Sequence, residues 1–154
     1  MRQIFCALAV LFLVCACSQE KEISNPQRDL SELTIGQGKN MHRFDVETAV
    51  KENEMRLGLM YRKEMPDNQG MIFIFLPPRN ISMWMKNTYI PLDMVFVNAD
   101  NKISGIIENT VPLSETFIHS PQATKAVVEL KAGTVKKLKI RKGELVRHKL
   151  LGNL

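Results

Sequence analysis

The stretch from Met83 to Asp93, MWMKNTYIPLD, gathers polar side chains directly behind an apolar segment. Lys86, Asn87 and Thr88 follow one another, and Asp93 comes after a proline. Polar groups on a loop at the end of a strand are typical of binding sites. A lysine and an aspartate brought together there could also exchange protons in acid/base catalysis. We therefore take this loop as the first candidate site.

The same spacing has a structural explanation. Asn87 and Thr88 can hydrogen-bond the backbone of a tight turn, and Lys86 can form an ion pair with Asp93 across the loop. Trp84, the only tryptophan, lies between two methionines. A tryptophan in an apolar strand anchors a core more often than it stacks on a ligand, so the core interpretation is favoured for Trp84.

Arg62 is a further candidate because a guanidinium offers a forked donor to a carboxylate or phosphate. Its structural alternative is an ion pair with a nearby acid: Glu54, Glu64 or Asp93. If Arg62 converges with Lys86, Asn87 and Asp93, the rim would hold two cations, one amide and one acid. Such a rim would suit a small anionic or sugar-like ligand.

Other chemical motifs are weak. The three histidines, His42, His119 and His148, are not spaced as metal ligands, so we expect no metal, and no motif indicates a cofactor. One segment between Pro112 and Pro121 invites a hydrolase hypothesis through its polar residues: Ser114, Thr116, His119 and Ser120. Closeness in sequence is not triad geometry, and a polar loop is the favoured interpretation.

The N-terminus predicts export. Residues 1–16 combine one positive charge, a long apolar run and small closing residues, as a signal peptide does. The end of the run resembles a bacterial lipobox, which makes Cys17 the predicted site of acylation. The apolar run would span only about 20 Å as a helix, against roughly 30 Å of hydrocarbon, so a transmembrane helix is the weaker interpretation. A plain cleaved signal peptide is the alternative.

These features predict a lipid-anchored protein of the cell envelope, held to the membrane through Cys17. Ser18 in the next position favours the periplasmic face of the outer membrane. All three cysteines fall at or before position 17, so the rest of the chain has no thiol and no disulfide. The net charge is +5, with basic clusters at residues 136–142 and 147–149 that contain no aromatic residue. Stacking on bases is therefore unsupported, and we expect no nucleic-acid partner.

The remaining pattern predicts a mainly β domain. Residues 17–40 would be a lipidated cysteine and a flexible tether, and residues 41–154 a single domain. Apolar runs and turn residues indicate strands at 41–50, 71–76, 81–85, 92–97, 103–108, 123–130 and 144–149. One short helix is expected over 52–61, and residues 133–140 fit either a helix or a strand. We predict a compact antiparallel jelly-roll-like sandwich or barrel with one or two short helices.

Several blocks carry a resemblance to a known family. Gly58-Leu59-Met60-Tyr61-Arg62, Gly70-Met71-Ile72-Phe73-Ile74-Phe75 and Trp84-Met85-Lys86-Asn87-Thr88 occur in order, and Val128-Glu129-Leu130, Ala132-Gly133 and Gly143-Glu144 follow. Together they resemble domain of unknown function family 192, an uncharacterised bacterial and archaeal family, over residues 41–148. Glu144 stands where the family more usually has aspartate. The resemblance implies a jelly-roll-like β fold and export, but no reaction.

Three hypotheses follow for function. The favoured one is an exported, lipid-anchored binding or accessory module, a monomer that holds a small envelope component at Arg62 and the loop from Lys86 to Asp93. The second is a structural or protein-interaction lipoprotein that uses the basic segment 136–142. The third is a hydrolase of envelope glycan that uses Lys86 and Asp93 as an acid/base pair. Whether the protein is an enzyme stays open.

Overall fold

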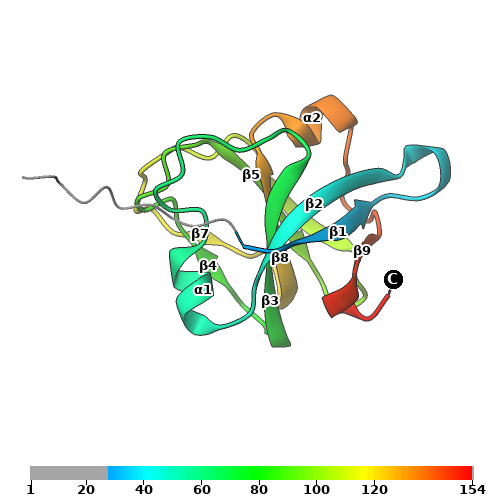
Figure 1. The fold of residues 1–154 in the computed structure, drawn as a ribbon. Helices are drawn as coiled ribbons and strands as arrows, with labels where there is room; N and C mark the ends of the chain where they lie inside the picture. The colour runs from blue at the N-terminus through cyan, green and yellow to red at the C-terminus, as the bar shows by residue number, and fades with distance from the viewer. Residues whose placement is uncertain (1–27, 154) are drawn as a thin grey trace, which may run out of the picture.

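The computed structural model describes residues 28–153 (Figure 1). The predicted signal peptide, residues 1–16, and the predicted acylation site, Cys17, lie outside this range. Within it the chain forms nine strands, two short α-helices and two 3-10 helices. None of the helices in this range is long and apolar enough to cross a membrane.

The strands are β1 (Leu30–Ile35), β2 (His42–Ala49), β3 (Gln69–Arg79), β4 (Ser82–Met83), β5 (Leu92–Val97), β6 (Ile103–Ile107), β7 (Ile118–His119), β8 (Thr124–Lys131) and β9 (Val146–His148). The helices are α1 (Glu52–Leu57) and α2 (Thr134–Leu138), and the 3-10 turns are Gly38–Asn40 and Lys149–Leu151. The mainly β class with short helices is therefore confirmed, and residues 133–140 contain a helix.

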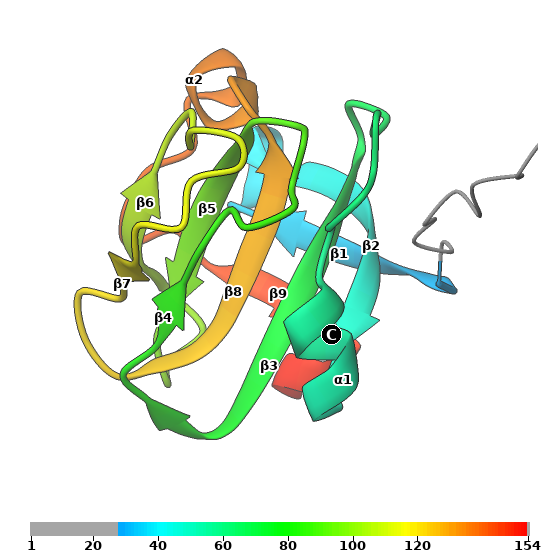
Figure 2. The same cartoon turned by 90° about the vertical axis from the view of Figure 1, so that its left-hand side faces the viewer.

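Seven strands form one curled sheet in the order β6-β5-β8-β3-β2-β1-β9 (Figure 2). The two edges of this sheet meet where Lys102 and Leu145 form an isolated bridge. Beside it the N–H of Ile103 donates to the carbonyl of Glu144 at 2.9 Å. The sheet is thus a barrel that closes at one end, which agrees with the predicted sandwich or barrel.

One pair of strands departs from the antiparallel expectation. β2 and β3 run parallel, with Glu47 opposite Met71. Parallel neighbours need a long crossover, and the connection through α1 and residues 58–68 supplies it. The two-residue strands β4 and β7 pair only with each other, outside the main sheet.

The predicted tether extends too far into the domain. β1 lies inside residues 17–40, yet it pairs with both β2 and β9. Leu33 and Ile35 on β1 are fully buried. Sequence reasoning missed this strand because its first residues, Leu30 to Glu32, have their outer face in solvent and resemble a linker in composition. The domain therefore begins by residue 30 and not at residue 41.

Each face of the sheet carries its own hydrophobic cluster. On β8, Val128 and Leu130 belong to the cluster inside the barrel, whereas Val127 belongs to the cluster on the other face. Side chains alternate along a strand, so Glu129 is directed to the same side as Val127. α1, β4 and β7 lie over that second face (Figure 2). Both clusters lie within residues 33–151, so the described domain has a complete core of its own.

The helix α1 is fixed at both ends. The carboxylate of Glu54 accepts from the backbone N–H groups of Lys51 and Val50, each at 3.0 Å. These bonds hold the pKa of Glu54 below its usual value of 4.5. Gly58 ends the helix at φ 46°, and a Cβ there would lie 3.3 Å from the ring of Phe73. Glycine therefore lets the end of α1 pack closely on β3.

Candidate functional site

A pocket of about 340 Å³ opens between α1, the residues that follow it, and the second face of the sheet. Its walls are mainly apolar, with side chains that include Met55, Leu59, Phe73, Phe75, Ile81 and Met83. The polar or charged side chains of its lining are Glu52, Arg56, Ser82, Thr88 and Glu129. Volumes of roughly 300 to 1,000 Å³ and walls of this kind are typical of small-molecule sites. This pocket is the candidate site.

Two stacked aromatic rings form part of the pocket wall. Trp84 and Phe117 both line it, with ring centroids 5.9 Å apart and planes inclined by 11°. The two residues are 39% and 57% exposed. The core interpretation of Trp84 is therefore wrong. β4 ends at Met83, so the chain leaves the ladder there, and Met85 takes the buried position instead.

Thr88 also lines the pocket and closes a tight turn. Its N–H donates to the carbonyl of Met85 at 3.0 Å, and its hydroxyl donates to the carbonyl of Lys86 at 3.3 Å. Asn87 has a positive φ of 54° and its amide donates to the Tyr61 hydroxyl at 3.0 Å. The predicted bond to the turn backbone is thus made by Thr88, whereas the Asn87 amide bonds the Tyr61 side chain instead. Thr88 lines the pocket as well.

Lys86 and Asp93 do not meet. The Lys86 ammonium lies 3.4 Å from the carboxylate of Glu115 at the surface. The fully buried carboxylate of Asp93 accepts from the N–H of Asn109 and from the N–H of Val135, each at 2.9 Å. Asp93 therefore ties β5 to the start of α2. The predicted ion pair between Lys86 and Asp93 is wrong, and an acid/base pair of these two residues has no support in the geometry.

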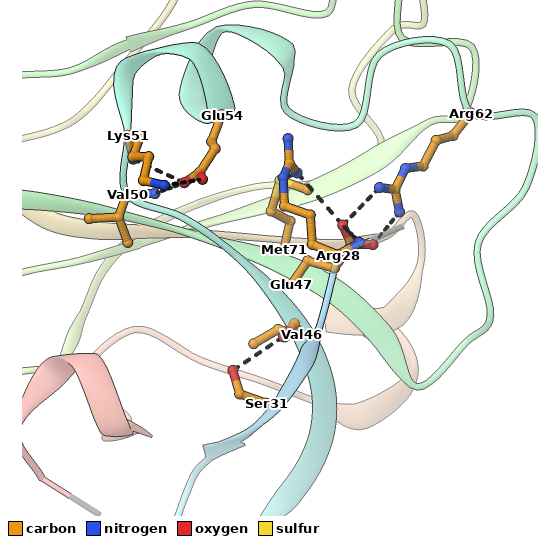
Figure 3. A network of polar contacts seen from close by, with 9 residues as sticks. All are labelled: Arg28, Ser31, Val46, Glu47, Val50, Lys51, Glu54, Arg62 and Met71. Atoms are coloured by element: carbon orange, nitrogen blue, oxygen red, sulfur yellow. Dashed lines mark hydrogen bonds and ion pairs between the residues drawn. The ribbon is translucent and has the colours of Figure 1, made fainter. Parts of the chain in front are cut away.

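Arg62 is part of a partly buried ion cluster around the buried Glu47 (Figure 3). Its guanidinium binds both carboxylate oxygens of Glu47, with Nη2 to Oε2 at 2.8 Å. The backbone N–H of Arg28 donates to the same carboxylate at 3.0 Å, and its guanidinium lies 3.6 Å away. The three acids expected beside Arg62 are not the partner seen here, which is Glu47 of β2. The sequence proposed six site residues: Arg62, Trp84, Lys86, Asn87, Thr88 and Asp93. Of these six, only Trp84 and Thr88 line the pocket.

Glu129 is the functional candidate that sequence reasoning missed. It is 4% exposed and lines the pocket from β8, between Met71 of β3 and Met94 of β5. Burial raises the pKa of Glu129 from 4.5 to about 8. Within residues 28–153 its carboxyl has no hydrogen bond or ion pair. The available signal was an acid inside the aliphatic run from Ala126 to Leu130.

The polar side chains of the segment between Pro112 and Pro121 make one turn contact and two contacts to the chain around β4. Ser120 accepts from the N–H of Ile81 at 2.9 Å, and Ser114 accepts from the N–H of Thr116 at 3.2 Å. His119 instead lies 2.9 Å from the hydroxyl of Ser82, its cross-strand partner in the β4–β7 ladder. The favoured polar-loop interpretation therefore holds for Ser114 and Thr116, whereas His119 lies on β7.

A second serine–histidine pair is buried. The hydroxyl of Ser31 lies 2.7 Å from Nε2 of His148. Nδ1 of His148 accepts from the N–H of Leu150, so Nε2 carries the proton and donates to Ser31. Burial lowers the pKa of His148 to about 4. His148 is therefore a neutral structural donor and no base for Ser31. No group of three or more potential metal ligands is found within the described range.

Comparisons with known proteins place this geometry in a family. A solved protein of unknown function from Novosphingobium aromaticivorans DSM 12444 is 38% identical, with a TM-score of 0.74, covering 77% of this chain and 85% of its own. A solved putative transcription regulator from Sinorhizobium meliloti 1021 is 39% identical, with a TM-score of 0.76, covering 80% of this chain and 97% of its own. The comparison with curated proteins gives no match. The profile of the family described as uncharacterized ACR, domain of unknown function 192, matches residues 33–148, and the chain belongs to that family.

Proposed function

We propose that this protein is a binding module for a small, predominantly apolar molecule that enters the pocket beside α1. The observation that carries the proposal is an apolar pocket of about 340 Å³ with a stacked aromatic pair and one buried carboxyl in its lining. Partly exposed aromatic rings at a concave apolar site supply contact area that a ligand can cover. This ligand class replaces the small anionic or sugar-like one, because Arg62 is engaged by Glu47 and Lys86 by Glu115.

Trp84 allows a direct test because it is the only tryptophan and lines the pocket. We expect n-butylbenzene, added to the chain from residue 18 onward, to change the fluorescence of Trp84 saturably. Phe117→Ala should weaken this binding about tenfold, since it removes the ring that stacks on Trp84.

Leu113→Ala is the matched control. Leu113 is 55% exposed in the same segment as Phe117 but does not line the pocket. The dissociation constant of n-butylbenzene for Leu113→Ala should equal that for the unchanged chain. A fluorescence signal that does not saturate, or equal weakening by the two substitutions, would contradict the proposal.

We also propose that the module is attached to the envelope through an acylated Cys17, at the periplasmic face of the outer membrane. The apolar run of residues 1–16 and Ser18 support this placement. Expression in a diderm bacterium should yield a diacylglyceryl-modified N-terminal Cys17 by mass spectrometry. Cys17→Ser should move the protein from the membrane fraction to the soluble fraction. Full retention of this variant in the membrane would contradict the proposal.

A nucleic-acid-binding role, which the name of the Sinorhizobium relative would suggest, has little support in this chain. α2 is five residues long, which is short for a helix that reads a DNA groove. Lys137 of α2 is paired with Asp67 at 3.4 Å. The basic segment 136–142 also contains no aromatic residue. We therefore propose a small molecule and not a nucleic acid as the partner.

A further inference from the structure

Two buried glutamates lie in one row of the sheet and are treated differently. Glu47 of β2 is opposite Met71 of β3, and Met71 is opposite Glu129 of β8. Glu47 is neutralised by Arg62 and Arg28. Glu129 has methionines on both neighbouring strands and the pocket in front of it. Among the residues that the structure describes, this row therefore holds one paired glutamate and one unpaired glutamate that borders the pocket.

The surroundings of Glu129 keep its carboxyl uncharged. An isolated carboxylate in an apolar site is costly, so the group retains its proton instead. Its pKa of about 8 means that the protonated form dominates at neutral pH. The other charged residues of the pocket, Glu52 and Arg56 of α1, make no hydrogen bond or ion pair with Glu129 in the described range. Glu129 thus offers the pocket an O–H donor.

We infer that Glu129 binds the ligand directly, donating a hydrogen bond from its protonated carboxyl to an oxygen acceptor at the buried end of an uncharged, otherwise apolar molecule. The inference rests on the proposed function and names the ligand class. A carbonyl or ether oxygen would satisfy the buried O–H, whereas a plain hydrocarbon would leave it unsatisfied. Carboxylic acids held neutral in apolar sites serve elsewhere as hydrogen-bond donors to an oxygen.

The cost of this acid to the fold supports a functional role. Its neighbours on β8, Val127 and Val128, show that the strand accommodates aliphatic residues on both faces. An aliphatic side chain in place of Glu129 would remove the cost of desolvating a carboxyl group in an apolar wall. Residues that lower stability in this way are characteristic of binding sites.

The test uses three probes of similar size that differ at one end. They are 4-phenyl-2-butanone with a carbonyl, n-butylbenzene with a methyl group, and 3-phenylpropylamine with an ammonium group. Dissociation constants are measured by calorimetry near neutral pH for the chain from residue 18 onward, for Glu129→Gln and for Glu129→Met. Methionine has no donor and matches the neighbouring Met71 and Met94, so this variant should keep the fold, which circular dichroism checks.

We expect Glu129→Met to weaken binding of the ketone about five- to tenfold and to leave n-butylbenzene unchanged or bound more tightly. Glu129→Gln should keep the ketone affinity, because its amide N–H still donates. Equal effects of Glu129→Met on the ketone and the hydrocarbon would overturn the inference alone. Tightest binding of the amine, lost in Glu129→Gln, would also overturn it by identifying a cation site. No binding by any probe would overturn the proposed function as well.

Discussion

Replacing Glu129 with glutamine should change how the stability of the domain depends on pH. The pKa of Glu129 is about 8 in the folded protein, and unfolding returns it toward 4.5. Between these values the native state holds a proton that the unfolded chain has lost. The free energy of unfolding therefore falls as pH rises, by about 1.4 kcal/mol per pH unit.

His148 acts in the opposite direction. Its pKa is about 4 in the folded protein and 6.5 in the unfolded chain, so the unfolded chain binds the extra proton between these values. Stability from this group is lost as pH falls below 6.5, with a slope of about 1.4 kcal/mol per unit. From pH 4.5 to 6.5 the slopes of Glu129 and His148 cancel. Above pH 6.5 only the Glu129 slope remains, which amounts to about 2 kcal/mol by pH 8.

Urea unfolding of the chain from residue 18 onward, followed by circular dichroism from pH 4.5 to about 9, measures both slopes. The unchanged protein should show a plateau up to pH 6.5 and then a decline. Glu129→Gln should instead gain about 3 kcal/mol between pH 4.5 and 6.5 and then stay level. His148→Gln should decline from pH 4.5 onward. Parallel curves for the unchanged protein and Glu129→Gln between pH 6.5 and 8 would refute a buried, protonated Glu129.

Three further substitutions test the structural roles assigned above, each by urea unfolding at neutral pH. Asp93→Asn should cost about 1–3 kcal/mol, because its amide N–H₂ cannot accept from the buried N–H of Val135; an unchanged midpoint would contradict the tie to α2. Glu47→Gln should cost about 3 kcal/mol by leaving Arg62 without its carboxylate, and a cost below about 1 kcal/mol would argue against an ion cluster around a buried Glu47. Gly58→Ala should cost about 1–3 kcal/mol, because alanine is strained at φ 46° and its Cβ meets a phenylalanine ring at 3.3 Å; a stabilised variant would refute this.

Strands with a simple boundary could be predicted from the sequence. β5 has the predicted bounds, Leu92–Val97, because a proline precedes this apolar run and a turn follows it. The Asn98 side chain accepts from the N–H groups of Asp100 and Lys102 in that turn. β1 was not predicted, because a strand with one solvated face and few large side chains resembles a linker until its partners are known.

The mainly β class and the positions of most strands could be predicted from local periodicity and turn residues. The ordered sequence blocks carried the resemblance to the family. It also showed an acid inside the aliphatic run of β8. The partners of the polar groups could not be predicted in this way, because they lie on segments that are distant in sequence and meet only in the fold. The crossover between β2 and β3 brings Arg62 to Glu47, and Glu129, two strands away in the same row, lines the pocket. The two-residue strand β4, which pairs only with β7, ends before Trp84, so Trp84 lies at the pocket and not in the core.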